Sequence, residues 1–238
     1  MAAPGTRPAR VRLLVGEVDA KDVTTRTVIP SSALALWSPF VRVGETIATP
    51  RKRFGSHTHA RQEVLIYMIE GAAQHTFDPG GSEELPTGSV LFLSAMPTAA
   101  HAVNPRPGRT ARWFSVVTEL PEGGKAPEGR RVGRPTPTPI QPDGTSLLPL
   151  VGPGAPSASS LGLEATAIEF VEAGTAFRRV GPNRRALFYG LGGRGMIDNT
   201  PVETGEAALV ENSAAVSVSG EAGFRVVHVA VPHSGSSL

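Results

Sequence analysis

The 238-residue sequence contains no cysteine. Disulfides, thiolate nucleophiles and thiolate metal ligands are therefore excluded, and any metal must be bound by nitrogen and oxygen ligands. The sequence also lacks a continuous apolar run of about 18 residues, the length that a membrane-spanning helix requires. Its first residues carry charges and no apolar stretch of signal-peptide length. These absences predict a cytoplasmic protein with no membrane partner.

Clustered positive charge is also scarce. The formal net charge is only +2, and the largest basic cluster consists of Arg178, Arg179, Arg184 and Arg185. Such a short cluster fits a solvated hairpin or an anion-binding patch. Proteins that bind nucleic acids electrostatically present a broader basic face, so direct nucleic-acid binding is not expected.

Glycine and proline are abundant, whereas aromatic residues make up only 5% of the chain. The 27 glycines and 22 prolines favour short strands joined by tight turns over a helical bundle. The apolar run at residues 64–69 ends at Glu70 and Gly71, and Gly88 introduces another apolar run at residues 90–93. Runs of this length between turn residues are typical of buried strands. The sequence therefore predicts an all-β fold.

Strand-like segments fall into two regions. They occupy roughly residues 10–120 and 145–231, and a segment rich in proline and glycine separates them. We therefore expect an N-terminal barrel at 1–120, a connector at 121–144 and a C-terminal barrel at 145–238. The two regions also repeat in outline, because placing residues 64–71 over residues 186–193 aligns tyrosine with tyrosine and glycine with glycine.

The overlay distinguishes the two barrels at the positions of candidate ligands. It places His57 on Arg179, His59 on Gly181 and Glu63 on Arg185. The C-terminal region keeps His228 in an apolar run and His233 in the tail, where a structural or exposed role is the better interpretation. Any metal site is therefore expected in the N-terminal barrel.

His57, His59 and His101 are the candidate metal ligands. Alternate residues of a strand project from the same face, so His57 and His59 can converge on one ion. His101 comes from a later strand or turn, and Glu63 shares the facing of His57 if the strand is regular. A site of histidine nitrogens with a carboxylate suits iron, manganese, nickel or zinc. A His-x-His pair alone is common by chance, so the prediction depends on the combination.

Further residues are candidates for the wall of the barrel cavity. A small barrel can enclose one small molecule, and this predicts a small-molecule substrate. The candidate wall residues are Gln62, Tyr67, Met96 and Trp113, and core packing is the competing role for Met96 and Trp113. His75, in the hairpin after Gly71, is expected to hydrogen-bond locally and not to bind metal.

These residues together resemble the cupin superfamily, and within it the pirin family. The spacing from His57 and His59 to Glu63 and Gly71, followed by a strand that leads from Gly88 to His101, is similar to the two cupin motifs. The pirin-like features are Ser38-Pro39-Phe40, Tyr67, Glu70-Gly71 with His75, and Glu119-Leu120-Pro121. The resemblance implies two tandem cupin barrels of the jelly-roll type, a bicupin. It also implies one divalent metal ion in the N-terminal barrel, usually Fe(II), with manganese, nickel and zinc as alternatives.

The second motif departs from the pirin pattern. The family has His-x-Glu there, and this chain has His101-Ala102-Val103. The usual fourth ligand is therefore missing. Three alternatives remain open at this point: Glu63 takes its place, a three-histidine site keeps open positions, or the site has lost its metal.

The resemblance implies several functions. The preferred one is a metal-dependent dioxygenase of the quercetinase type that acts on a small enolic or phenolic molecule, with Glu63 as general base. The second is a metal-dependent or metal-free isomerase or cyclase. The third is a non-catalytic, redox-sensing co-regulator with a protein partner. The fold alone does not choose among them.

Overall fold

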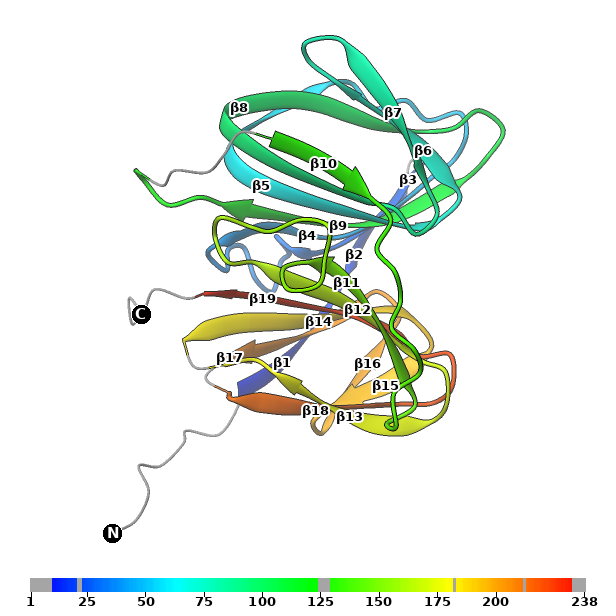
Figure 1. Ribbon diagram of the computed structural model, residues 1–238, viewed down its shortest axis with the longest axis vertical. Coiled ribbons are helices and arrows are strands. Elements are labelled where there is room, and N and C mark those ends of the chain that lie inside the picture. Colours follow the sequence, from blue (N-terminus) through cyan, green and yellow to red (C-terminus); the bar gives the residue numbers. More distant parts are fainter. Residues whose placement is uncertain (1–9, 21–22, 124–128, 182, 212, 233–238) are drawn as a thin grey trace. The chain divides into compact units, whose positions relative to one another are not determined.

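The computed structural model describes residues 10–20, 23–123, 129–181, 183–211 and 213–232 (Figure 1). All helix and strand elements in these residues are β-strands, which confirms the all-β prediction. The described residues form two compact units. The N-terminal unit contains residues 16–135 and 154–160, and the C-terminal unit contains residues 10–15, 136–153 and 161–232.

The N-terminal unit is built on one nine-stranded antiparallel sheet. Its strand order is β2-β3-β4-β9-β5-β8-β6-β7, and β10 pairs with β8. The strands are β2 (Glu17–Ala20), β3 (Val23–Ile29), β4 (Phe40–Ala48), β5 (His57–Glu70), β6 (Ala72–Phe77), β7 (Gly81–Pro86), β8 (Val90–Pro105), β9 (Ala111–Glu119) and β10 (Gly129–Gly133). The two longest strands, β5 and β8, lie side by side and carry the candidate ligands.

One face of this sheet, called the inner face below, carries the hydrophobic core of the unit. The buried residues of this core are Ala48, Val64, Ile66, Met68, Ala73, Leu85, Leu91, Leu93, Val103, Ala111, Trp113 and Val117. They recur at alternate positions along their strands, as residues of one face do, and residues of the other face such as Leu65, Phe114 and Val116 are buried as well. Burial of each larger apolar side chain contributes roughly 1.5–3 kcal/mol to folding.

A β-bulge divides β5. The register with β8 shifts between Ala60 and Gln62, and Arg61 has a φ of 53°. Arg61 of β5 lies opposite two residues of β8, Met96 and Pro97, and its left-handed conformation reverses the facing of the residues that follow it in β5. Gln62 and Val64 therefore lie on the inner face, as do the histidines before the bulge, and Glu63 lies on the opposite face. The expectation that Glu63 shares the facing of His57 is wrong, because β5 is not regular.

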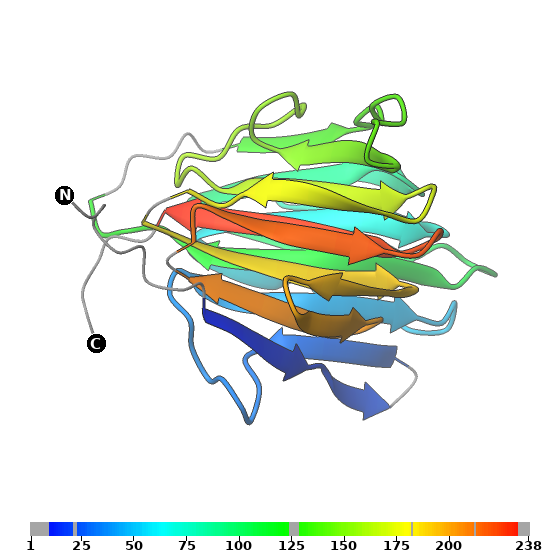
Figure 2. The ribbon, with the colours of Figure 1, turned by 90° about the horizontal axis from the view of Figure 1, so that it is seen from below.

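The C-terminal unit contains a six-stranded sheet and a four-stranded sheet. Their orders are β1-β17-β14-β19-β12-β11 and β13-β18-β15-β16, and in Figure 2 β19 (red) lies between β12 and β14. The strands are β1 (Arg10–Val15), β11 (Thr145–Val151), β12 (Glu164–Phe170), β13 (Gly174–Arg179), β14 (Arg184–Gly192), β15 (Arg194–Ile197), β16 (Thr200–Glu203), β17 (Glu206–Glu211), β18 (Ala215–Gly220) and β19 (Arg225–Pro232). Apolar side chains from both sheets, including Phe188 and Val218, fill its core.

The unit boundaries differ from the expected ones in three places. Residues 10–15 belong to the C-terminal unit because β1 pairs with β17, and residues 154–160 belong to the N-terminal unit. Within the expected connector at 121–144, residues 129–133 form β10 and extend the N-terminal sheet. Pairing between segments far apart in sequence decides these boundaries, and local composition does not reveal it.

Backbone conformation supports the predicted duplication. Arg61 and Asn183 have φ values of 53° and 56°, and Gly71 and Gly193 have φ values of 75° and 73°. Both pairs are matched by the overlay that aligned the two regions. An uncommon left-handed conformation at equivalent positions indicates that the two units share a strand and turn pattern.

Candidate metal centre

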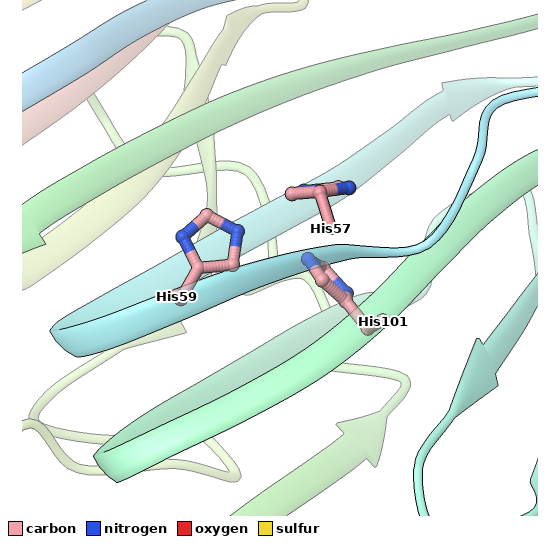
Figure 3. A group of neighbouring side chains, drawn as sticks. All are labelled: His57, His59 and His101. Carbon is pink, nitrogen blue, oxygen red and sulfur yellow. The ribbon is translucent and has the colours of Figure 1, made fainter.

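Three histidines converge on the inner face of the N-terminal unit. His57 pairs with His101 across β5 and β8, and His59 follows two residues later on β5 (Figure 3). One potential ligand atom from each ring lies within 4.8 Å of the others. The ring centroids are 4.7 to 5.1 Å apart. The structure therefore brings the three predicted ligands together.

Gln62 fixes the orientation of the His59 ring. The His59 Nδ1 atom is 2.7 Å from the Gln62 Oε1 atom. An amide oxygen only accepts hydrogen bonds, so Nδ1 carries the proton and donates it. The Nε2 atom then keeps its lone pair, and it is buried without a hydrogen-bond partner. The bulge after Ala60 is what brings Gln62 to this face.

A chain of hydrogen bonds fixes His101 in the same way. The Glu83 Oε1 atom is 2.8 Å from His75 Nδ1, and His75 Nε2 is 3.1 Å from His101 Nδ1. The carboxylate accepts from His75 Nδ1, so the lone pair of His75 Nε2 accepts from His101 Nδ1. Arg130 Nε, 2.9 Å from the same Glu83 oxygen, holds the end of the chain. The His101 Nε2 lone pair is left buried and without a partner.

Burial keeps these imidazoles neutral. Burial, and after it the neighbouring His57, His59 and His75, lower the pKa of His101 to about 3. Burial is also the main cause of the lowered pKa values of His59 and His75. A neutral imidazole is the form that binds a metal ion, so no proton has to be displaced from these rings at neutral pH.

The two bare nitrogens are the test of whether a metal fits this site. Most buried polar atoms in proteins have a hydrogen-bond partner, and leaving one without a partner costs about 1–3 kcal/mol. His59 Nε2 and His101 Nε2 are both buried and unpartnered, beside His57. Imidazole nitrogens are good ligands for divalent iron, nickel, copper and zinc. The residues therefore fit one divalent metal ion.

Glu63 does not lie with the histidines. Its buried carboxylate accepts hydrogen bonds from Ser159 Oγ at 2.5 Å, from Ser160 N at 2.8 Å and from Ser160 Oγ at 2.6 Å. It is not part of the group of potential ligands. The structure thus contradicts the placement of Glu63 in the site, both as fourth ligand and as general base. The bulge in β5 places Glu63 on the opposite face of the strand, where Ser159 and Ser160 bind its carboxylate.

The position of the usual fourth ligand is apolar. Val103 is a buried core residue that pairs with His75 across β8 and β6. Among the described residues, the group of potential ligands contains His57, His59 and His101 and no carboxylate. Of the alternatives that the sequence left open, the geometry supports a three-histidine site.

The four candidate wall residues occupy different places. Gln62 adjoins His59, and Trp113 packs in the core with its ring edge to face against Phe54, at a centroid distance of 5.8 Å. Tyr67 lies on the side of β5 opposite the inner face, since it is an odd number of residues from Gln62 on the regular part of the strand. Met96 is partly buried, close to the shift in register between β8 and β5.

Sequence reasoning missed Arg42. This arginine lies in β4 opposite Val117 of β9, and Val117 belongs to the inner-face core. The available signal was a charged residue inside the otherwise apolar stretch at residues 40–43. His75 was expected to hydrogen-bond locally, and it does so, although its contact with His101 was not expected.

The C-terminal unit lacks the equivalent site among its described residues. Where His57 pairs with His101, the C-terminal unit pairs Arg179 with Ala215. His228 is buried and stacks on Phe188 at a centroid distance of 4.6 Å. His233 lies outside the described residues. The predicted difference between the two barrels is visible in these pairings.

Solved structures of known proteins share this architecture. The bacterial pirin YhhW of Escherichia coli, in complex with nickel(II), matches with a TM-score of 0.79 at 17% identity, over 94% of this chain and 100% of that one. GK1651 of Geobacillus kaustophilus matches with a TM-score of 0.83 at 18% identity, over 97% and 98%. The chain has the pirin fold. The predicted bicupin architecture is therefore confirmed.

Sequence similarity to pirin-fold proteins is weaker and partial. Quercetin 2,3-dioxygenase of Escherichia coli is 26% identical over 86 residues, which span 36% of this chain and only 37% of that protein. A quercetin 2,3-dioxygenase of Acinetobacter baumannii shares the fold with a TM-score of 0.78 at 15% identity, over 94% of this chain and 79% of that one. No family model matches this chain. In the described part, no helix has the length and apolar character needed to cross a membrane.

Proposed function

We propose that this pirin-fold chain is a metal-dependent dioxygenase of the quercetinase type that acts on a small enolic or phenolic molecule. The observation that carries the proposal is the pair of buried, unpartnered nitrogens, His59 Nε2 and His101 Nε2, beside His57 on the inner face. The similarity to proteins named quercetin 2,3-dioxygenase supports the reaction type. Iron(II) is the proposed metal, with manganese, nickel and zinc as alternatives.

Each side chain of the site has a limited task. When bound, a redox-active metal would supply the chemistry of dioxygen and would lower the pKa of a substrate hydroxyl. Gln62 and His75 hold His59 and His101 in the tautomer whose Nε2 atom is free. Val103 and Trp113 supply apolar surroundings on the inner face, while His57 is exposed to solvent.

Among the residues that the structure describes, the site has no carboxylate that could act as general base. Glu63 is occupied by Ser159 and Ser160 on the other face of β5. The substrate hydroxyl would therefore lose its proton to solvent, helped by the lowering of its pKa at the metal, so that the substrate is held as an anion. This requirement favours enols and phenols of low pKa, because the charged form is already populated near neutral pH.

The test combines metal analysis with oxygen consumption. Protein purified without added metal, and then loaded anaerobically with iron(II), is expected to bind one ion per chain and to consume oxygen when a flavonol is added. His59→Ala and His101→Ala are expected to abolish both. Thr58→Ala changes an exposed residue between the two histidines of β5 and serves as the matched control.

Two outcomes would contradict the proposal. Full metal content in both histidine variants would show that the three histidines are not the ligands. Stoichiometric metal with no oxygen uptake on any flavonol, enol or phenol tested would reject the dioxygenase. That second result would favour an isomerase, a cyclase or a protein-binding role for the same site.

A further inference from the structure

Arg42 is a charged residue on the inner face of the metal-site unit. The register of β4 with β9 shifts between Phe40 and Arg42, and Arg42 then pairs with Val117. Cross-strand partners project from the same face of a sheet, and Val117 packs in the inner-face core with Val64 of β5. Arg42 and the three histidines therefore lie on the same face of the sheet.

Arg42 has no anionic partner. It is half-buried, and within the described residues its side chain has no hydrogen bond and no ion pair. Other arginines of the same unit are paired: Arg26 and Arg112 bind Glu45, and Arg130 binds Glu83. Arg42 differs in this respect from the other half-buried arginines of the unit, since Arg61 also has a hydrogen-bond partner in the Leu120 carbonyl oxygen.

The guanidinium of Arg42 is partly buried and has no charged partner among the described residues. Burial lowers the pKa of Arg42, but a guanidinium keeps its proton in proteins. No Arg42 nitrogen is among the fully buried polar atoms without a partner, so the charge is only partly desolvated, and an anion would restore the interaction that burial removes. The fork of the guanidinium matches a carboxylate with two parallel hydrogen bonds.

The charge of the metal site also favours an anionic ligand. A divalent ion on the three histidines would bring two positive charges, and Arg42 would add a third. Val103 stands where a carboxylate would have balanced part of this charge, and Glu63 is bound elsewhere. The described residues of the site thus supply positive charge and no negative charge.

We propose that Arg42 recognises the carboxylate of the substrate, which is a small organic acid whose enol or phenol oxygen reaches the three-histidine site. This inference rests on the proposed function and narrows its substrate class. Neutral flavonols would then be poor substrates compared with hydroxy acids of similar size. Arg42 would set specificity and is not needed to hold the metal.

The experiment compares an acid with its neutral analogue. Salicylate and salicylamide, which differ in the carboxylate, are titrated by calorimetry into the zinc-loaded and the metal-free protein, with benzoate and oxalate as further acids. The wild-type protein is expected to bind salicylate roughly 10-fold more tightly than salicylamide, as a charge-assisted bidentate contact would give. Arg42→Gln is expected to lose this preference, and Arg42→Lys to retain part of it.

The controls separate this inference from the proposed function. Arg109→Gln removes an exposed arginine and is expected to keep the preference for the acid. Zinc binding and thermal unfolding are measured for every variant, so a folding defect is recognised by a lowered melting temperature. Equal affinity for salicylate and salicylamide, no binding of any acid, or an unchanged preference in Arg42→Gln would overturn the inference. Absence of metal binding in the wild-type protein would instead overturn the proposed function.

Discussion

Replacement of His75 by phenylalanine tests the hydrogen-bond chain behind the metal site. The change keeps an aromatic ring in the buried position and removes both ring nitrogens. His101 Nδ1 then loses its acceptor at 3.1 Å, and Glu83 loses one of its partners while keeping Arg130. No described metal ligand is altered, so any effect on metal binding must act through His101.

The expected loss is tenfold to a hundredfold in metal affinity. Removal of an outer partner of a metal-binding histidine typically has an effect of this size, about 1.4–2.7 kcal/mol. The upper part of the range applies here for two reasons. His101 is only 2% exposed, so water does not replace the lost acceptor. In addition, a released His101 ring can adopt the tautomer with the proton on Nε2. The Nε2 atom then has no lone pair with which to bind the metal.

The assay is a calorimetric titration of zinc into metal-free protein, followed by thermal unfolding of both forms. His75→Gln keeps an acceptor and is expected to recover part of the affinity. Thr76→Ala, an exposed neighbour on β6, is the control and is expected to match the wild type. A folded His75→Phe protein that binds zinc within twofold of the wild type would contradict this prediction.

Three further predictions concern the carboxylates and the second unit. Glu63→Gln is expected to leave the metal content unchanged and to lower the free energy of unfolding, measured by urea denaturation, by about 1–3 kcal/mol. The reason is that the charge-assisted contacts of the carboxylate with Ser159 and Ser160 weaken. Lost metal with unchanged stability would contradict this. Val103→Glu is expected to tighten zinc binding about tenfold by adding a charged ligand beside His101, and an unchanged affinity would show that the carboxylate does not reach the ion. The third prediction is a pH effect: burial lowers the pKa of His228 to about 3 from 6.5, so its neutral form stabilises the fold fully above pH 6.5 and this contribution falls as the pH drops toward 3. At pH 5 the loss is about 2 kcal/mol, and His228→Phe is expected to flatten the dependence of the unfolding free energy between pH 7 and pH 5; an equal slope in both proteins would count against it.

The architecture was largely predictable because it depends on local patterns. Apolar runs bounded by glycine marked the strands, and the repeat of these runs indicated two barrels. The exchange of residues 10–15 and 154–160 between the units was not predictable, because β1 is assigned by its pairing with β17, nearly 200 residues later. Composition describes a segment and not its partner.

The candidate site was predictable up to residue 60 of β5 and not beyond it. The spacing of His57 and His59 holds because the strand is regular there, and the pairing with His101 follows. The sequence does not reveal that Arg61 has a φ of 53°. Positions with a positive φ are usually taken by glycine, asparagine or aspartate, and arginine is not typical of them.

The bulge at Arg61 determines the chemistry proposed for the site. In a regular strand, Glu63 would face the histidines, and a carboxylate would be available as ligand or base. With the bulge, Gln62 takes the inner face and orients His59, while Glu63 joins Ser159 and Ser160 on the other face. The site therefore gains a neutral positioning residue and loses its negative charge. A positively charged site that has no base favours a substrate that is already an anion. We therefore expect an anionic substrate whose carboxylate is bound by Arg42.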